Sequence, residues 1–444
     1  MNLHLRGLEP TEFPDQLYEL LHACFKGSDE SKIFQRLHFE RPYDIPSWEY
    51  SRVGTLDGNL VSHAGIWKFD LQLTPGIVLK SGGIRDVCTD PEQQKKGYGH
   101  QVLQDACKFM EQEELQFSVL YAGPKKFYRA LGWYDGRPSY AVEIDAETFS
   151  QNIKELNIDV NLSIKQLESY DDKIADKLRD IRKKTNYDLN FIVIRDKDYF
   201  SRLLKVSSAV PEGKSRNFMI TDTDTSDIIG YVLTKIAGGP EGRHLQITEA
   251  RFLSDDQSAV CSKTLELLFK TNDISKISIS LSPSHPITAT ALSLGAKDST
   301  GLISGIMVKF ISLPGFFKAI VDAKNKEINS REYNSMLSNI EFPIVLIISG
   351  DAGAKTVLKF SLDNSHENLV MEILGPEHDV NRYKPHIGIV RMPEEILPPL
   401  MFSTIYSIEE ALDDEMIEIQ QTSPDFLEFL IGDYCWDKEI TDYF

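Results

Sequence analysis

The fold of the first third of the chain is decided by one stretch, which reads Gly82-Gly83-Ile84-Arg85-Asp86-Val87-Cys88-Thr89-Asp90-Pro91-Glu92-Gln93-Gln94-Lys95-Lys96-Gly97-Tyr98-Gly99-His100. Its beginning is typical of a strand that ends near Thr89, and Gly97 and Gly99 are typical of a turn that opens a helix. A helix tip attracts anions through its unpaired backbone N–H groups and the positive end of its dipole. The stretch therefore predicts a strand, a turn and a helix that hold a diphosphate on backbone donors, with Lys95 and Lys96 adding positive charge.

Around this stretch the sequence predicts a mixed sheet with helices on both faces. Asp57-Gly58 is a two-residue hairpin signal between two apolar runs. The expected strands are Leu3–Leu8, Ser51–Leu56, Asn59–Leu73, Ile77–Thr89, Phe117–Ala122 and Tyr140–Ile144, and the expected helices are Thr11–Phe25, Gly97–Glu114 and Pro124–Leu131. Tyr140–Ile144 is expected to close this first sheet.

Two further blocks follow. The second repeats the order of strands and helices without repeating the sequence, and we expect Leu302–Phe310 to be its last strand. Its counterpart of the glycine turn has no glycine and carries Asp255 and Asp256, which repel a diphosphate. The third block has the alternation of a twisted, half-buried sheet with short helices. The predicted fold class is α/β with mixed (α+β) sheets, and the predicted domains are 1–150, 151–311 and 312–444.

The composition limits the class of partner. A formal net charge of −19 over 444 residues argues against nucleic acid, which needs a basic face, and leaves cationic substrates open. From Ile405 to Phe444 there are twelve Asp or Glu residues and only one basic residue, Lys438. This acidic stretch is either a solvated surface or the lining of a pocket that attracts cations.

The apolar and cysteine patterns indicate the compartment. The longest apolar run, about Phe342 to Ile348, is too short to cross a bilayer, and the N-terminus has no secretory signal pattern. Five scattered cysteines without a CxxC pair fit a reducing cytoplasm and argue against a zinc site. We therefore expect a cytoplasmic protein with no membrane span and no metal.

The glycine turn resembles the acetyl-CoA signature of the GNAT superfamily of N-acetyltransferases, (Gln/Arg)-x-x-Gly-x-(Gly/Ala). Gln94, Gly97 and Gly99 stand at its fixed positions. The resemblance implies acetyl-CoA as the co-substrate, with its arm pairing along the end of the preceding strand in a gap beside Phe117–Ala122. The cofactor-binding residues it implies are Val87, Cys88, Thr89, Gln94, Lys95, Lys96, Gly97, Tyr98, Gly99, His100 and Gly123.

A second stretch looks like the other GNAT hallmark, a short helix with Phe-Tyr before x-x-x-Gly-(Phe/Tyr/Trp). It reads Ala122-Gly123-Pro124-Lys125-Lys126-Phe127-Tyr128-Arg129-Ala130-Leu131-Gly132-Trp133. When an amine attacks a thioester, a phenol can protonate the departing thiolate, so Tyr128 is the predicted general acid. The other interpretation is a core tyrosine that packs on the sheet. For the base, Asp86, His63 and Arg85 are possible participants, although ionisable residues on central strands are more often structural.

The whole chain resembles the Eis family of bacterial acetyltransferases, in which two GNAT-like domains precede a sterol-carrier-protein-like domain. Local matches are Arg195–Leu204, Met307–Pro314 and the aromatic end Thr441–Phe444, although one arginine of the first segment falls a position early. The resemblance implies that the terminal carboxylate of Phe444 enters the first domain as the base. It also implies a second domain without acetyl-CoA and a homo-oligomer, a hexamer.

These observations favour an enzyme that transfers acetyl from acetyl-CoA to a primary amine of an aminoglycoside, a polyamine or a lysine-like acceptor, with Tyr128 as acid and Phe444 as base. One alternative is an acyl-CoA- or lipid-binding module without amine acetylation. Another is a protein or peptide acetyltransferase, which uses the same cofactor site. The identity of the acceptor stays open at this point.

Overall fold

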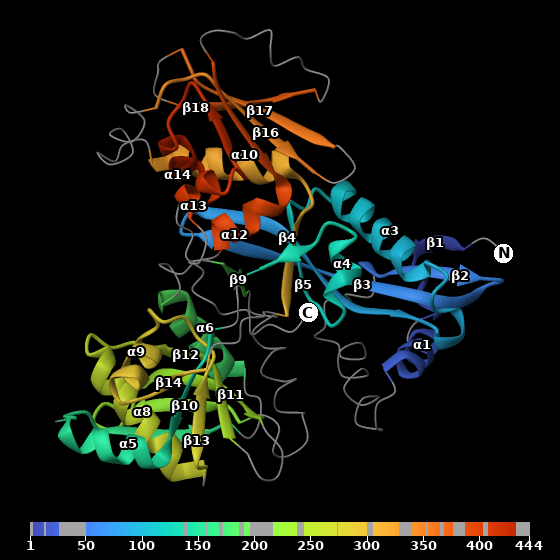
Figure 1. Cartoon of the computed structure of the whole chain (residues 1–444). Helices are drawn as coiled ribbons and strands as arrows, with labels where there is room; N and C mark the ends of the chain where they lie inside the picture. Colours follow the sequence, from blue (N-terminus) through green and yellow to red (C-terminus); the bar gives the residue numbers. More distant parts are fainter. Residues whose placement is uncertain are drawn as a thin grey trace.

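The structure is a computed structural model, and it describes residues 3–12, 15–25, 50–136, 140–156, 158–167, 172–185, 191–195, 216–237, 244–272, 274–299, 305–327, 340–350, 354–364, 368–375, 387–402 and 407–431. Within these ranges the strands form three sheets of eight, seven and five strands, with helices packed on them (Figure 1). The predicted class of mixed α/β sheets is confirmed. Within the same ranges, no helix is both long and apolar enough to cross a membrane.

The first sheet has the strand order β1-β2-β3-β4-β5-β15-β6, with β9 paired to β3. Its strands are β1 His4–Gly7, β2 Arg52–Leu56, β3 Asn59–Thr74, β4 Ile77–Thr89, β5 Phe117–Tyr121, β6 Tyr134–Asp135, β9 Ile192–Ile194 and β15 Ile306–Phe310; its helices are α1 Asp15–Phe25, α3 Tyr98–Gln112 and α4 Lys125–Arg129. Asp57 and Gly58 join β2 to β3 with φ of 50° and 85°, as the hairpin signal predicts.

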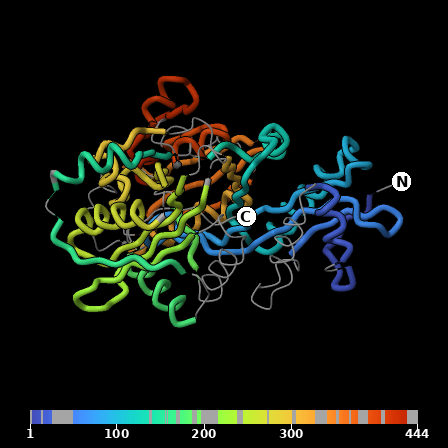
Figure 2. The backbone as a smooth tube through the Cα atoms, turned by 90° about the horizontal axis from the view of Figure 1, so that it is seen from below, coloured from blue at the N-terminus to red at the C-terminus, as the bar shows by residue number. Residues whose placement is uncertain are grey.

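The second sheet has the order β14-β7-β13-β12-β11-β10-β8. Its strands are β7 Val142–Asp145, β8 Leu162–Gln166, β10 Phe218–Asp222, β11 Ile228–Ala237, β12 His244–Phe252, β13 Lys276–Ile279 and β14 Lys297–Asp298; its helices are α5 Ala146–Asn152, α6 Asp172–Thr185, α8 Gln257–Asn272 and α9 Pro286–Ser293. As in the first sheet, two central strands run parallel, here β12 and β13. Figure 2 views the molecule from below, with the N-terminal elements in blue at one end and the second sheet in green and yellow at the other.

The first two sheets exchange a strand, which differs from the prediction. Tyr140–Ile144 was expected to close the first sheet, but β7 pairs with β13 and β14 of the second sheet. Leu302–Phe310 was expected to end the second sheet, but β15 lies between β5 and β6 of the first. Both segments are short apolar strands, and an apolar pattern does not encode which sheet a strand joins. The boundaries 1–150, 151–311 and 312–444 stay a prediction.

The third sheet has the order β18-β17-β16-β19-β20. Its strands are β16 Ile344–Ser349, β17 Lys355–Leu362, β18 Leu369–Leu374, β19 Gly388–Pro393 and β20 Glu418–Gln420; its helices are α10 Leu313–Lys324, α12 Leu397–Phe402, α13 Ile408–Asp413 and α14 Asp425–Ile431. In Figure 1 the helix α10 lies between this sheet and the first sheet. One apolar cluster joins the two sheets through α10, including Leu71, Phe117, Phe316 and Phe360.

Three helices of the first sheet pack around the end of β4. A second cluster on the first sheet packs α3 and α4 against its central strands, through Leu103 and Met110 of α3 and Tyr128 of α4. A smaller cluster packs α1 against Cys88 near the end of β4. Three helices therefore pack near the end of β4, where the predicted functional residues of β4, α3 and α4 lie.

Candidate active site at the open end of β4

The strand β4 loses one neighbour near its end. It pairs in parallel with β5 only from Ser81 to Ile84, although β4 itself continues to Thr89. On its other side the pairing with β3 continues, with Thr89 opposite Ser62. Among the described residues, no strand pairs with the peptide groups of the last residues of β4 that point away from β3. This is an edge to which an extended chain can add by backbone hydrogen bonds.

A β-bulge accompanies this divergence. Arg85 pairs with Gly65 and Cys88 with His63, so Asp86 and Val87 together lie opposite a single residue of β3. Asp86 has a φ of 50°, in the left-handed region that non-glycine residues seldom adopt. A bulge bends its strand and re-aims the residues that follow. The bulge thus turns the end of β4 away from β5.

Next along the chain is the glycine turn. Asp90 accepts a hydrogen bond from the backbone N–H of Glu92 at 2.8 Å and begins a short 3-10 turn over Pro91–Gln93. Gly97 then forms the N-cap of α3 with φ 81° and ψ 5°, and no side chain caps this helix. A positive φ at the cap favours glycine, and an uncapped tip leaves the first backbone N–H groups of α3 for a ligand.

The second glycine of the turn lies against β4 and α4. A Cβ on Gly99 would meet the Thr89 Oγ1 at 3.0 Å and the ring of Phe127 at 3.5 Å. The neighbouring His100 ring packs edge-on to Phe127, with centroids 6.3 Å apart. Close packing at Gly99 therefore brings the tip of α3, the end of β4 and the start of α4 to one place. Gln94 closes the turn, since its Nε2 donates to the Thr89 carbonyl at 3.3 Å.

Tyr128 of α4 lies beside this end of β4. Its side chain is buried between Phe127 and Trp133, and both rings pack edge-on to it. Burial, together with the nearby thiol of Cys88, raises the pKa of Tyr128 to about 12. Among the described residues, none forms a hydrogen bond with the Tyr128 hydroxyl. The phenol is therefore protonated at neutral pH and available to a group in the gap.

Of the remaining residues that the sequence predicts for the site, Lys95, Lys96 and Gly123 lie in the loops beside the end of β4. Lys96 lies in the glycine turn, where its Nζ donates to the Oε1 of Gln93 at 2.7 Å, and Lys95 precedes it with a φ of 63°. Gly123 lies between β5 and α4, and no heavy atom of the part of the chain that the structure describes is within 4 Å of a Cβ built on it. Phe444 lies outside the described residues. No group of three or more His, Cys, Asp or Glu side chains that could hold a metal occurs among the described residues.

The sequence did not predict the groups on β3 and α1 that contact the end of β4. Ser62 donates to the Cys88 carbonyl at 2.8 Å. The thiol of Cys88 lies near that of Cys24 from α1, and this neighbour together with burial raises the pKa of Cys88 well above its usual value. His63 was considered as a base, but its ring is fully buried and both its nitrogens have partners. These contacts depend on the register between β3 and β4, which cannot be predicted from the sequence of either strand.

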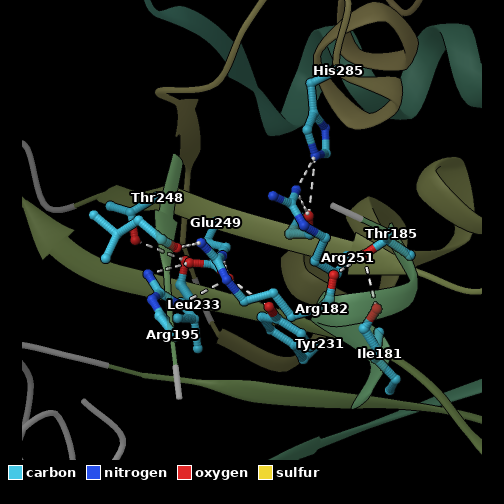
Figure 3. Close-up of polar contacts among 12 residues, drawn as sticks. Ile181, Arg182, Thr185, Arg195, Tyr231, Leu233, Thr248, Glu249, Arg251 and His285 are labelled. Atoms are coloured by element: carbon cyan, nitrogen blue, oxygen red, sulfur yellow. Dashed lines mark hydrogen bonds and ion pairs between the residues drawn. The ribbon is translucent and has the colours of Figure 1, made fainter. Parts of the chain in front are cut away.

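A second buried polar cluster lies in the second sheet (Figure 3). The carboxylate of Glu249 on β12 contacts the Arg182 guanidinium from α6 at 2.5 Å and that of Arg195 at 2.9 Å. The Tyr231 hydroxyl on β11 donates to the same carboxylate at 2.5 Å. Burial alone would raise the pKa of Glu249, but Arg182, Arg195 and Arg251 outweigh it and hold the pKa well below its usual value.

This cluster connects two sheets. Arg195 directly follows β9, which pairs with β3 of the first sheet. Arg182 also donates to the Val193 carbonyl on β9 at 3.3 Å. Glu249 therefore links the second sheet to β9 of the first sheet. β9 pairs with β3, and β3 is the strand next to β4.

The second sheet has a gap like that of the first, but protein groups fill it. β12 pairs with β13 only over Leu245–Ile247, and Thr248 is an extra residue opposite β11. The Ala250 carbonyl beyond it accepts hydrogen bonds from the Arg251 guanidinium at 2.9 Å and from His285 Nε2 at 3.1 Å. Burial and the Arg251 charge lower the pKa of His285 to about 3. The Ala250 carbonyl is thus already bonded to a neutral imidazole and a guanidinium of the protein.

Comparisons with known proteins agree with this geometry. Residues 4–135 match the family described as acetyltransferase (GNAT) domain. No curated protein sequence matches the chain. Solved structures share its fold: GCN5-related N-acetyltransferases from Anabaena variabilis (15% identity, TM-score 0.64, 98% of this chain and 99% of that one) and Kribbella flavida (13%, 0.64, 97% and 96%), and Eis1 from Mycobacterium abscessus (11%, 0.60, 98% and 97%).

At such identities the solved structures establish the fold, and the function follows from the matched domain. GNAT domains in general transfer an acyl group from acetyl-CoA to an amine. Residues 4–135 supply β4, the glycine turn, α3 and Tyr128, which are the parts of the site described above. The chain therefore contains a GNAT acetyltransferase domain and is an acyltransferase.

Proposed function

We propose that the chain is an acetyl-CoA-dependent N-acetyltransferase that transfers acetyl to a primary amine by direct attack. One observation carries the proposal: the free edge of β4 beyond Ile84 meets the uncapped, glycine-opened tip of α3, with Tyr128 buried beside them. A backbone edge, a set of unpaired N–H groups and a protonated phenol are what a thioester with a diphosphate needs.

The residues fit the co-substrate. The diphosphate would lie on the first N–H groups of α3, because Gly97 turns the chain there and Gly99 allows close approach. Lys95, Lys96 and His100 flank that place, as do Gln94 and Tyr98. The arm would add to the free edge of Val87–Thr89 and extend past Gly123 towards Tyr128. Acetyl-CoA, when bound, supplies an activated acetyl thioester.

The acid in the transfer is Tyr128. As the amine nitrogen bonds to the acetyl carbon and the carbon–sulfur bond breaks, the phenol gives its proton to the departing sulfur. Its raised pKa keeps that proton in place before the step. By resemblance to the Eis family, the terminal carboxylate of Phe444 takes the proton that the amine loses.

The role of Phe444 has a direct test. Appending a few residues after Phe444 moves the carboxylate away, and we expect turnover to fall by about 100-fold or more, the contribution of a general base. Thiol release with the best amine measures turnover, while circular dichroism and the acetyl-CoA dissociation constant check that fold and co-substrate site are intact. Full turnover in the extended protein would remove Phe444 from the mechanism, and Asp86 would be the next residue to test.

Two features of the second sheet support one active site per chain. Ala250 corresponds to Val87 of β4, because each lies three positions beyond the last residue that pairs with the parallel neighbouring strand. The Ala250 carbonyl already accepts hydrogen bonds from protein side chains. Asp255 and Asp256 precede α8 where the glycine turn precedes α3. Both features oppose a diphosphate and its arm. We propose that this unit is a degenerate GNAT-like domain.

The third unit is proposed to be a sterol-carrier-protein-like scaffold that positions the C-terminus. The acceptor is proposed to be a small cationic amine: an aminoglycoside, a polyamine or a lysine-like group. The net charge of −19 supports this class, since an acidic protein attracts cations and the attraction weakens with salt. Assembly as a homo-oligomer, a hexamer by family resemblance, is part of the same proposal.

Two measurements test the proposed function. Calorimetry should detect binding of coenzyme A, and thiol release should depend on an amine across a panel of aminoglycosides, polyamines, amino acids and peptides. Binding without amine-dependent release would favour the acyl-CoA-binding module instead. Release with peptides alone would favour the peptide acetyltransferase. No heat with well-folded protein would remove the assignment of the glycine turn.

Replacing Gly99 by Val tests the glycine turn itself. The Cβ would contact Thr89 and Phe127, and the branched side chain would enter the place of the diphosphate. We expect the dissociation constant of coenzyme A to rise at least about tenfold, equivalent to about 1.4 kcal/mol. Gly375→Val is the matched control, because no atom of the described residues lies within 4 Å of a Cβ there. Equal binding by Gly99→Val and the wild type would contradict the proposed site.

A further inference from the structure

A buried chain of hydrogen bonds lies behind the β4 bulge. The Nδ1 of His63 on β3 is 2.9 Å from the Asp86 carbonyl oxygen, and its Nε2 is 3.0 Å from the Ser51 Oγ. Both residues are buried: His63, on β3, is 0% exposed, and Ser51, directly before β2, is 1% exposed. The residues join β2, β3 and β4 at the point where β4 leaves β5.

The direction of the hydrogen bonds follows from the groups involved. A carbonyl oxygen only accepts, so the Nδ1 of His63 must carry the hydrogen and donate to Asp86. Burial lowers the pKa of His63, although the Asp86 carbonyl and carboxylate oppose this, so the ring is neutral and its Nε2 is an acceptor. The Ser51 hydroxyl then donates to Nε2. Each group has one role, and the ring is held in one tautomer.

The bonded carbonyl belongs to the one residue of the bulge with a positive φ. Asp86 is not a glycine, so its φ of 50° must be imposed by its surroundings. The imidazole is a rigid donor beneath this carbonyl. Because Asp86 precedes Val87, Cys88 and Thr89, the orientation of its peptide sets which way their backbone groups face.

We propose that His63 is a positioning residue for the acetyl-CoA site, which it orders through the bulge of β4. The inference rests on the proposed function, since the backbone of residues 87–89 is the proposed site of the acyl-CoA arm. His63 contacts neither the arm nor the amine and exchanges no proton in the reaction. Its loss is expected to weaken co-substrate binding more than the chemical step.

Two amide variants separate positioning from general stability. The Asn amide nitrogen occupies about the place of the imidazole Nδ1, so His63→Asn keeps the bond to Asp86. The Gln amide reaches the place of Nε2, so His63→Gln keeps the contact with Ser51 and loses the bond to Asp86. We expect both variants to melt at similarly lowered temperatures. We expect the coenzyme A dissociation constant and the acetyl-CoA KM to rise about tenfold in His63→Gln and less than about threefold in His63→Asn.

The outcomes are distinguishable. If both variants bind coenzyme A as tightly as the wild type, or weaken equally, His63 is only structural and the inference is wrong. If the wild type itself gives no heat with coenzyme A, the proposed function fails instead. If both amide variants are too unstable, Ser51→Ala replaces them as the test. It keeps the His63 ring and removes only the hydroxyl that fixes the tautomer of that ring. We expect its acetyl-CoA KM to rise about threefold with kcat retained, and an unchanged KM would overturn the inference.

Discussion

Replacing Tyr128 by Phe is expected to lower kcat by about 100- to 10,000-fold, the usual contribution of a general acid. The variant loses only the hydroxyl, while the ring contacts with Phe127 and Trp133 remain. Without a proton donor the sulfur must depart as a thiolate. The acetyl-CoA KM should change little, because the proposed binding groups lie on β4, in the glycine turn, on α3 and at Gly123, and do not include the Tyr128 hydroxyl. Single-turnover thiol release at saturating acetyl-CoA measures the effect.

The pH dependence adds a second readout for Tyr128. Its pKa is raised to about 12, so the phenol stays protonated across the range in which the protein can be assayed. Loss of its proton therefore should not limit the wild-type rate up to about pH 10. Tyr134→Phe, which removes a hydroxyl from β6 of the same sheet, is the matched control and should retain activity. If Tyr128→Phe turned over as fast as this control, Tyr128 would be a core tyrosine and not the acid.

Replacing Glu249 by Gln is expected to lower the free energy of unfolding by about 3–5 kcal/mol, as breaking a buried ion pair does. The variant keeps the shape of the side chain but leaves the buried charges of Arg182 and Arg195 without their carboxylate. The Tyr231 hydroxyl also loses a charged acceptor, although an amide oxygen can replace part of that bond. Urea unfolding followed by fluorescence and circular dichroism measures the loss.

Glu266→Gln is a matched control for Glu249→Gln. Glu266 forms ion pairs with Lys263 and Lys270 on the surface of α8, and such exposed pairs contribute about 0–1 kcal/mol. The chemical change is identical and only burial differs. If both variants lost the same small amount of stability, the Glu249 cluster would not be holding the two sheets together. A loss confined to the second sheet in hydrogen exchange would also contradict the link through β9.

Local features of the fold and site could be predicted from the sequence. The helix expected at Gly97–Glu114 is observed at Tyr98–Gln112, and the hairpin at Asp57-Gly58 forms as expected. These predictions succeed because glycines at a turn and an apolar stripe act over a few neighbouring residues. The glycine turn and the Phe127-Tyr128 pair are likewise recognised from their local spacing, whereas their meeting at one end of β4 comes from tertiary packing. The roles predicted for these residues stay predictions.

Features that depend on distant pairing could not be predicted. Nothing in β7 or β15 indicates that each joins the other's sheet, because both are short and apolar. Glu249 and Arg251 look like the polar side of an alternating strand, yet both are buried. The chain of hydrogen bonds through His63 needs the register of β2, β3 and β4 together. Such information lies in contacts between segments far apart in the chain.

The position of β15 has a consequence for biosynthesis. Residues 306–310 form a strand between β5 and β6, although residues 4–135 alone match the acetyltransferase family. A ribosome completes residues 4–135 long before it reaches β15, the strand that separates β5 from β6 near one edge of the sheet. During synthesis, the edge of β5 that pairs with β15 stays unpaired until more than half of the chain beyond residue 135 has been made. A gene fragment cut directly after residue 135 would encode this sheet without β15, and β5 and β6 would then lack the strand that joins them.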